Sequence, residues 1–244
     1  MIIYNPDQKL FTSTLINDTT YSSGFGTKML GNARNSENVI RFFRDNFPEV
    51  THVIILEQIH STNISVIDDK NKNSNIIEDT DGLLTCLPYT ALIVRNADCV
   101  PLIFVDKTNG FIGISHQGWR GSLKKMAGKM VKNFMDTGSK IENIKVAIGP
   151  SIGDCCYEVD DDHYYTFREE FDQFTNLIFH LKKGRWHLNL GYLNYLQLIE
   201  SGLNTSQIDF FPFCTKCDEE RFSSKRRAKN SYFETMFNFI YKRE

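Results

Sequence analysis

The sequence predicts a single α/β domain over residues 1–244, built from a mixed β-sheet with helices. Of its 244 residues, 41% are hydrophobic and 13% aromatic, which is enough apolar material for a sizeable core. Short apolar runs with strand-like composition fill the first half of the chain, and helical periodicity begins only after them. No linker separates two compositions, so we expect one domain.

The predicted strands are runs of four or five residues rich in branched side chains. They are VIILE (53–57), GLLT (82–85), ALIV (91–94), PLIFV (101–105) and FIGIS (111–115). Brief turns such as residues 106–110 join neighbouring runs, which predicts hairpins and a mixed or antiparallel sheet. The polar stretch 68–81 predicts a surface loop.

The apolar period changes after these runs. A helix is predicted by apolar residues spaced four, three and four positions apart, namely Leu123, Ala127, Met130 and Phe134. Ser122 is its expected N-cap and Gly138 follows its expected end. The later elements are a strand over 145–149, helices over 160–174 and 190–201, and a closing strand over 236–241.

Charge and hydropathy narrow the class of protein. Lys and Arg total 28 against 30 Asp and Glu, which argues against a general nucleic-acid binder. No apolar run is long enough to span a bilayer, and the N-terminal MIIYNPDQKL becomes polar too soon for a signal peptide. We therefore expect a soluble, cytoplasmic protein that binds neither nucleic acid nor a membrane. Its six cysteines are expected to be free thiols or metal ligands.

Three potential metal ligands follow strand-like runs: His60, Cys99 and His116. Two imidazoles and one thiolate suit Zn²⁺ and leave a fourth position open for water, as catalytic zinc requires. Copper is possible with the same donors, although a multicopper centre needs more histidines than the six present. The alternative is a buried cysteine beside two hydrogen-bonded histidines.

The remaining cysteines give a weaker pattern. Cys214 and Cys217 have the C-x₂-C spacing of half a zinc ribbon. Cys155 and Cys156 could complete it, but adjacent cysteines rarely ligate one tetrahedral metal together. We expect no second zinc, and we expect Cys86 to lie in the core.

Several motifs occur in the order typical of one family. They are SGFGTK (23–28), QIH (58–60), DTDG (79–82), ADCVP (97–101), HQGWRG (116–121), GPSIG (149–153), CYEV (156–159) and CT (214–215). Over about residues 23 to 240 the chain resembles the YfiH-like family, also called the laccase-domain or multicopper polyphenol oxidase family. The combination of HQGWRG with ADC is specific.

The resemblance implies a YfiH-like α/β fold with a catalytic zinc on His60, Cys99 and His116. It also implies cleavage of purine nucleosides such as adenosine and inosine by phosphate, with adenosine deamination or cleavage of 5′-methylthioadenosine as further activities. Some members of the family are linked to peptidoglycan-precursor editing, and the laccase label implies copper.

Other residues are candidates for substrate contacts or for support of the ligands. Four cations are expected to bind phosphate or substrate: Lys28, Arg120, Arg226 and Arg227. Phosphate is also expected at the N-terminus of the helix that begins near Ser122. Trp119 is either a core aromatic or a platform for a base. Gln58 and Asp98 flank ligands and could fix a histidine tautomer, although a charge satisfied elsewhere is equally compatible with Asp98.

The sequence departs from the family pattern at some positions, and it leaves several alternative functions open. Asn96 precedes ADC where Thr is usual, and Ala228 replaces an acidic residue, which leaves the substrate preference open. A cysteine hydrolase with Cys99 as nucleophile would work without metal. A peptidoglycan-precursor hydrolase could use the same zinc site. A non-enzymatic metal-binding interaction protein would turn over no nucleoside. The oligomeric state is not indicated.

Overall fold

The computed structural model describes residues 1–229 and 231–244. Its helices are α1 (Ser36–Asn46), α2 (Trp119–Leu123), α3 (Met126–Asp136), α4 (Asp161–Glu170), α5 (Thr175–Ile178), α6 (Leu190–Glu200) and α7 (Lys225–Ala228). Its strands are β1 (Ile2–Asn5), β2 (Leu10–Ser13), β3 (Tyr21–Gly26), β4 (His52–Leu56), β5 (Ile64–Ile67), β6 (Ile76–Ile77), β7 (Gly82–Thr85), β8 (Thr90–Asn96), β9 (Val100–Asp106), β10 (Phe111–Gln117), β11 (Ile144–Ile148), β12 (Glu158–Val159), β13 (Phe179–Lys182), β14 (Arg185–Leu188), β15 (Ile208–Phe210) and β16 (Met236–Lys242).

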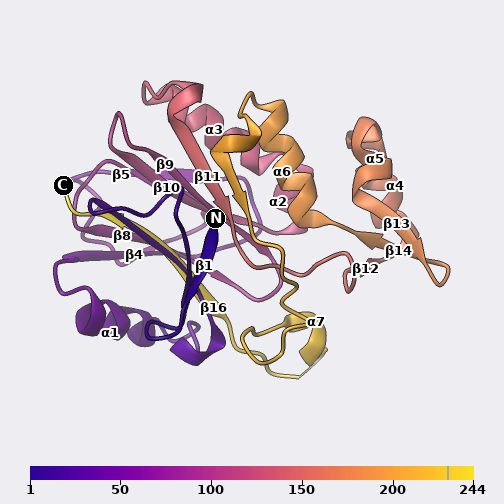
Figure 1. Ribbon diagram of the computed structural model, residues 1–244, viewed down its shortest axis with the longest axis horizontal. Helices are drawn as coiled ribbons and strands as arrows, with labels where there is room; N and C mark the ends of the chain where they lie inside the picture. Colours follow the sequence, from indigo (N-terminus) through magenta and orange to yellow (C-terminus); the bar gives the residue numbers. More distant parts are fainter. Residues whose placement is uncertain (230) are drawn as a thin grey trace.

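The strands form three sheets. One has seven strands in the order β1-β2-β3-β16-β8-β4-β6, and a second has six in the order β15-β11-β9-β10-β7-β5. Strands β12, β14 and β13 form a small third sheet, which lies beside α4 and α5 (Figure 1). Both large sheets combine parallel and antiparallel pairs, so the predicted mixed α/β class is confirmed. The expected single sheet is instead split, because β8 and β9 belong to different sheets.

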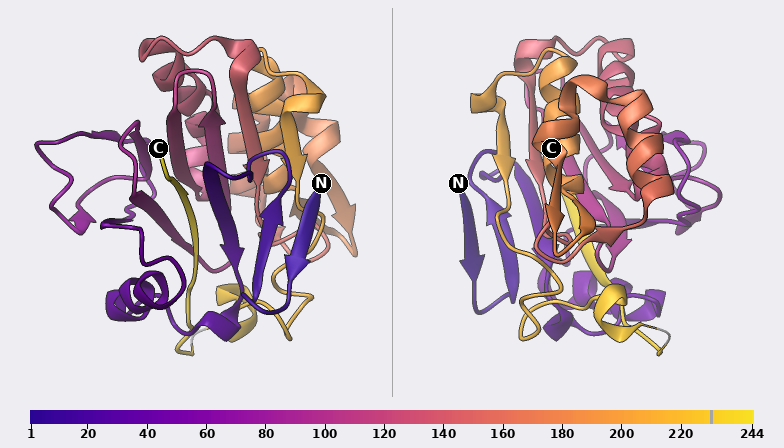
Figure 2. Two further views of the ribbon diagram at one scale, coloured as in Figure 1. Left: turned by 60° about the vertical axis from the view of Figure 1, so that its left-hand side comes forward. Right: turned by 90° about the vertical axis from the view of Figure 1, so that its right-hand side faces the viewer.

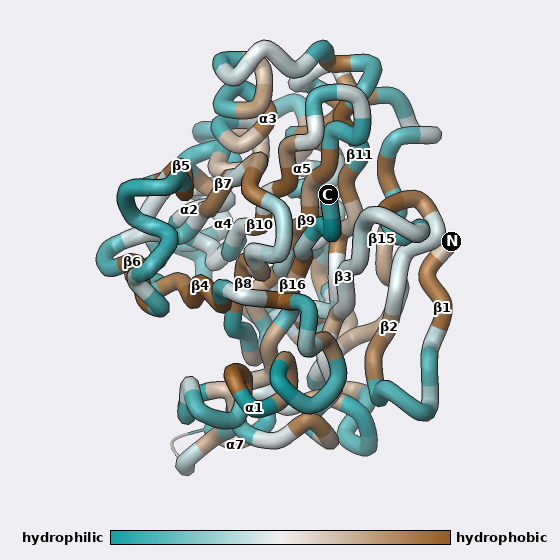
Figure 3. The backbone as a smooth tube through the Cα atoms, turned by 90° about the vertical axis from the view of Figure 1, so that its left-hand side faces the viewer, coloured by the Kyte–Doolittle hydropathy of each residue, from teal (hydrophilic) through white to brown (hydrophobic). Residues whose placement is uncertain are grey.

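The two large sheets pack face to face, and helices cover their outer faces (Figure 2). Successive residues of β9 alternate between two apolar clusters: Ile103 faces the other large sheet, whereas Phe104 faces α3 and α6. Likewise, Leu92 of β8 lies between the sheets, whereas Ile93 packs beneath α1. This double alternation explains why the runs carry apolar residues at every position. Figure 3 shows these hydrophobic strands, while the connections near β5 and β6 are mostly hydrophilic.

The predicted strands and the later helices are confirmed to within a few residues. The antiparallel hairpin of β9 and β10 is formed as expected. The predicted helix over Leu123 to Phe134 is wrong at its start, because the chain forms two helices separated by Lys124 and Lys125, and Lys125 has a positive φ of 58°. Gly118, and not Ser122, is the N-cap of the first one. Ser122 is buried inside α2, where its hydroxyl accepts a hydrogen bond from Asn194.

Further parts of the structure differ from the sequence prediction. The expectation that Cys86 lies in the core is wrong, because this residue is exposed. Strands β5 and β12 to β15 match no predicted strand. Strands β1 to β3 were not predicted, because their polar residues interrupt the apolar pattern. The stretch 68–81 is largely an exposed connection, but it contains β6 and ends in the fully buried Asp81. None of the helices in the described part of the chain combines the length and hydrophobicity needed to cross a bilayer.

Candidate metal centre

His60, Cys99 and His116 converge. One donor atom from each lies within 4.8 Å of the others. Nε2 of His60 is 3.9 Å from Sγ of Cys99. The two imidazole rings are nearly perpendicular, with centroids 4.8 Å apart. The sequence separated these residues widely, and the fold makes them neighbours.

Sheet register explains the convergence. Strands β4 and β8 pair in parallel, so their carboxyl ends lie at one edge, and there the chain crosses twice to the other sheet. His60 lies in the first crossing and Cys99 in the second. His116 is the penultimate residue of β10 and lies opposite Pro101, which places its ring beside the start of β9 and therefore beside Cys99. Two candidate ligands thus sit where the chain passes between the two sheets, and the third sits on a strand beside the second crossing.

The backbone around the ligands adopts unusual conformations. His60 has φ of 61° and Asp98 has φ of 86°, both in the left-handed region that costs energy for residues with a Cβ. Gly118 must be glycine, because a Cβ there would lie 2.5 Å from Cδ2 of His60 and 3.3 Å from Cε1 of His116. The two imidazoles therefore rest directly on the backbone at residue 118.

Asp81 supports the ligands, a role that our reasoning from the sequence missed. Its fully buried carboxylate accepts a hydrogen bond of 2.8 Å from Nδ1 of His116. It also accepts from the amides of His60 at 3.2 Å and Ser61 at 2.6 Å. Because Nδ1 of His116 is turned to this carboxylate, Nε2 is the ring nitrogen left to face Cys99 and to bind a metal in place of its proton. The DTDG motif contained the signal: an acid directly before a strand that pairs with β10.

The thiol and the imidazole shift each other's pKa. Burial raises the pKa of Cys99, but the charge and hydrogen bond of His116, with a hydrogen bond from His60, outweigh it and bring the value to about 6. Burial lowers the pKa of His116, but Cys99 and Asp81 outweigh it and raise the value to about 9. Cys99 is therefore held as a thiolate, the form that binds metals.

Gln58 and Asp98 do not hold a histidine ring. Gln58 exchanges two hydrogen bonds with the main chain of Arg95, at 2.7 and 2.8 Å. Asp98 accepts hydrogen bonds from Thr215 at 2.7 Å and from the amide of Arg226 at 2.7 Å. The expectation that either one fixes a histidine tautomer is therefore wrong, and Asp81 does this for His116. Asp98 instead ties the late segment of the chain to the loop that carries Cys99.

A cleft of about 1310 Å³ opens above the three ligands. Of the four cations predicted to contact substrate, Arg120 and Arg226 line it, whereas Lys28 and Arg227 are not among the described residues that do. The guanidinium of Arg227 donates to three main-chain carbonyls, so it shapes the loop before α7. Further cations on the walls are Arg34, Arg95, Arg185, Lys225 and Lys229.

Aromatic side chains orient the two cleft arginines. The guanidinium of Arg120 lies over the ring of Trp119, 4.3 Å from its centroid. Trp119 is half-buried against the core and also lines the cleft, so the two interpretations of this residue are compatible. Arg226 lies over Tyr157 at 5.0 Å and donates to the carbonyl of Glu158 at 2.7 Å. Both cations are therefore held at the cleft wall.

Known proteins share this sequence and this fold. The profile of the multi-copper polyphenol oxidoreductase laccase family matches residues 30–242. A purine nucleoside phosphorylase YlmD of Geobacillus stearothermophilus is 34% identical over 200 residues, covering 78% of this chain and 72% of that protein. Adenosine deaminase RL5 of an unknown prokaryotic organism is 29% identical over 186 residues, covering 73% and 71%.

Solved structures agree with these sequence matches. The crystal structure of YlmD from Geobacillus stearothermophilus superposes with a TM-score of 0.82 at 28% identity, over 97% of both chains. That of a Bacillus licheniformis hypothetical protein YfiH gives 0.82 at 28% identity, over 92% of this chain and 93% of the other. The two-sheet architecture and the matched sequence span lead to one conclusion: this chain belongs to the multi-copper polyphenol oxidoreductase laccase family, with the fold of its YfiH and YlmD structures.

Proposed function

We propose that this chain is a zinc-dependent purine nucleoside phosphorylase acting on adenosine and inosine, and on 5′-methylthioadenosine as a related substrate. The observation that carries the proposal is the convergence of His60, Cys99 and His116 beneath a cleft lined with cations. The likeness to a protein named purine nucleoside phosphorylase supports the same reaction class.

The donor set fits zinc. A thiolate and two imidazoles within 4.8 Å of one another match a three-ligand site with one open position. Asp81 supplies the carboxylate partner that metal-binding histidines usually have. When bound, zinc would act as a Lewis acid on an oxygen or nitrogen of the substrate or on water.

The cleft residues would bind and orient the two substrates. Arg120 and Arg226 provide planar guanidinium groups suited to the paired oxygens of phosphate. Phosphate is expected on these side chains and not on a helix N-terminus, because α2 has only five residues. Trp119 offers a ring edge or face to the purine. A phosphate oxygen would bond to the anomeric carbon as the glycosidic bond breaks, and the purine would leave with the electron pair and take up a proton.

Product analysis tests the proposal. Purified zinc-loaded protein is incubated with adenosine or inosine, with and without phosphate, and the products are separated by chromatography. We expect free base and ribose 1-phosphate only when phosphate is present. The Cys99→Ala variant should lose this activity, whereas Cys86→Ala should retain it, because Cys86 is exposed and lies outside the ligand group. Absence of turnover by the metal-loaded protein would refute the proposal.

Two other activities are distinguished by the same experiment. Deamination is favoured by the likeness to a protein named adenosine deaminase, and it would give inosine from adenosine without phosphate. Hydrolysis with Cys99 as nucleophile is favoured by the lowered pKa of its thiol, and it would survive removal of metal by a chelator. Phosphorolysis that stops on chelation and returns with zinc excludes both as the main reaction.

A further inference from the structure

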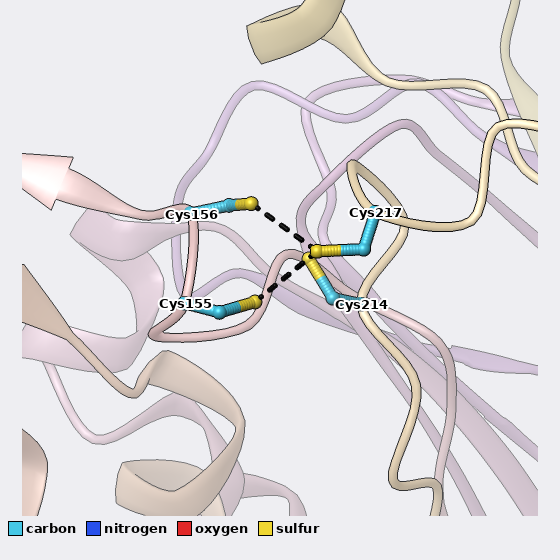
Figure 4. A group of neighbouring side chains, drawn as sticks. All are labelled: Cys155, Cys156, Cys214 and Cys217. Atoms are coloured by element: carbon cyan, nitrogen blue, oxygen red, sulfur yellow. Dashed lines mark hydrogen bonds between the residues drawn. The ribbon is translucent and has the colours of Figure 1, made fainter.

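A second group of metal-binding side chains lies outside the three-ligand centre. The sulfur atoms of Cys155, Cys156, Cys214 and Cys217 all lie within 4.8 Å of one another. Sγ of Cys217 is 3.4 Å from Sγ of both Cys155 and Cys156. Figure 4 shows the four side chains facing one another across two separate loops. All four are free thiols.

The adjacent pair can share one centre because of the turn before it. The amides of Cys156 and Tyr157 both donate to the carbonyl of Gly153, each at 2.9 Å. This tight turn directs Cys155 and Cys156 toward the same side, so that both sulfurs can reach one ion and the adjacency of the two cysteines is no longer a reason against a second zinc.

The distances suit a tetrahedral ion. Zinc–sulfur bonds of about 2.3 Å place the sulfurs of a regular tetrahedron roughly 3.8 Å apart. The two separations at Cys217 are 3.4 Å, slightly below that value, and all separations in the group stay within 4.8 Å. A disulfide would need about 2.05 Å, and Cys217 could bond to only one of its two equally near partners.

The surrounding backbone supports a thiolate cluster. The amide of Gly153 donates to Sγ of Cys214 at 3.1 Å, the kind of contact that stabilises a metal-bound thiolate. A Cβ at Gly153 would lie 3.2 Å from Cβ of Cys214 and 3.3 Å from Sγ of Cys155, so glycine allows this approach. The amide of Thr215 donates to the carbonyl of Ser151 at 2.9 Å, which aligns the two loops.

We propose that Cys155, Cys156, Cys214 and Cys217 bind a second zinc ion, structural in role and separate from the His60, Cys99 and His116 centre. Four protein sulfurs fill all tetrahedral positions, which closes the site to substrate. Four thiolates so close together would repel strongly, and a divalent cation offsets that repulsion.

The second zinc would fasten one wall of the cleft. It links the loop after β11, which leads to Tyr157, to the segment that leads to α7 and Arg226. Thr215, next to Cys214, also donates to Asp98 beside the first centre. This consequence for the cleft rests on the proposed function, whereas binding of the ion does not.

Metal stoichiometry tests the site without an activity assay. Protein is produced in the presence of zinc and purified under reducing conditions, and the number of zinc ions per chain is measured by inductively coupled plasma mass spectrometry. We expect two equivalents in the wild type, one in Cys217→Ser, one in Cys99→Ala, and none in the double variant. Cys86→Ser is the matched control and should keep two, because Cys86 is exposed and lies outside both groups.

X-ray absorption gives a second measurement if Cys217→Ser fails to fold. In the Cys99→Ala protein the remaining zinc should show about four sulfur ligands at about 2.3 Å. The proposal is overturned if the wild type holds a single equivalent of zinc and Cys99→Ala removes it. It is also overturned by a disulfide among the four cysteines, or by iron bound there in place of zinc. Two equivalents without nucleoside turnover would instead refute only the proposed function.

Discussion

Replacing Asp81 by asparagine should weaken metal binding without emptying the site of ligands. The carboxylate presents one oxygen to Nδ1 of His116 at 2.8 Å and the other to the amide of Ser61 at 2.6 Å. Asparagine has almost the same shape but keeps only one oxygen. Its nitrogen must face one of these two donors.

Either orientation has a definite cost. If the new amide nitrogen faces His116, the ring must carry its proton on Nε2, where the metal would bind. If it faces Ser61, two N–H donors oppose each other, and an unpartnered buried donor costs about 1–3 kcal/mol. Loss of a carboxylate partner of a metal-bound histidine lowers affinity by about 10–100-fold. We therefore expect Asp81→Asn to show both a weaker zinc affinity in this range and a lower free energy of unfolding.

The assay is competition for zinc with a chromophoric chelator, combined with denaturant unfolding of the metal-free protein. Asp106→Asn is the matched control, because Asp106 is also fully buried and accepts main-chain amides through Oδ1. Among the described residues its Oδ2 has no partner, so an amide nitrogen in that place breaks no hydrogen bond. Asp106 is at the far end of β9 from Cys99 and should leave zinc affinity unchanged. A zinc affinity of Asp81→Asn within twofold of the wild type would refute the reasoning.

Three further changes test other parts of the structure. Gly118→Ala should abolish zinc binding at the three-ligand centre, because the new Cβ would lie 2.5 Å from Cδ2 of His60. Zinc content is measured in a Cys217→Ser background, and full retention of zinc at that centre would contradict this expectation. Arg226→Lys should raise the KM for phosphate by roughly tenfold, because a bidentate contact becomes a single one; initial rates at varied phosphate check it, and an unchanged KM would remove Arg226 from the phosphate site. Glu49→Gln should lower the melting temperature at neutral pH only. Burial raises the pKa of Glu49, but the hydrogen bond from Tyr241 and the charge and hydrogen bond of Arg243 outweigh burial and lower this pKa. The carboxylate therefore stabilises the fold above its pKa in the unfolded chain, and the stabilisation disappears as the pH falls through its pKa in the folded protein. An equal difference in melting temperature at pH 7 and pH 3 would contradict the assignment.

The secondary structure was predictable where local pattern and burial agree. Strands such as β9 are apolar on both faces because both faces are covered, and continuous runs of branched residues mark them. Strands β1 to β3 mix polar and apolar residues without a clear period, so they were missed. The break between α2 and α3 was also missed, because the apolar spacing continues across Lys125 although its backbone is left-handed.

The sequence by itself determined the α/β class, the strands β4, β7 to β11 and β16, and the residues His60, Cys99 and His116 as candidate ligands. Only the tertiary structure decided which residues accompany them. Asp81 reaches His116 because β7 pairs with β10, and a pairing between distant strands leaves no local pattern. The second cluster forms because a turn at Gly153 and the bridge between Ser151 and Cys214 bring two loops together, and with them Cys155, Cys156, Cys214 and Cys217. The sequence states which side chains are present and therefore what chemistry they offer. Which of them become neighbours depends on the register between strands and on the connections between the two large sheets, and both are set by burial across the whole chain.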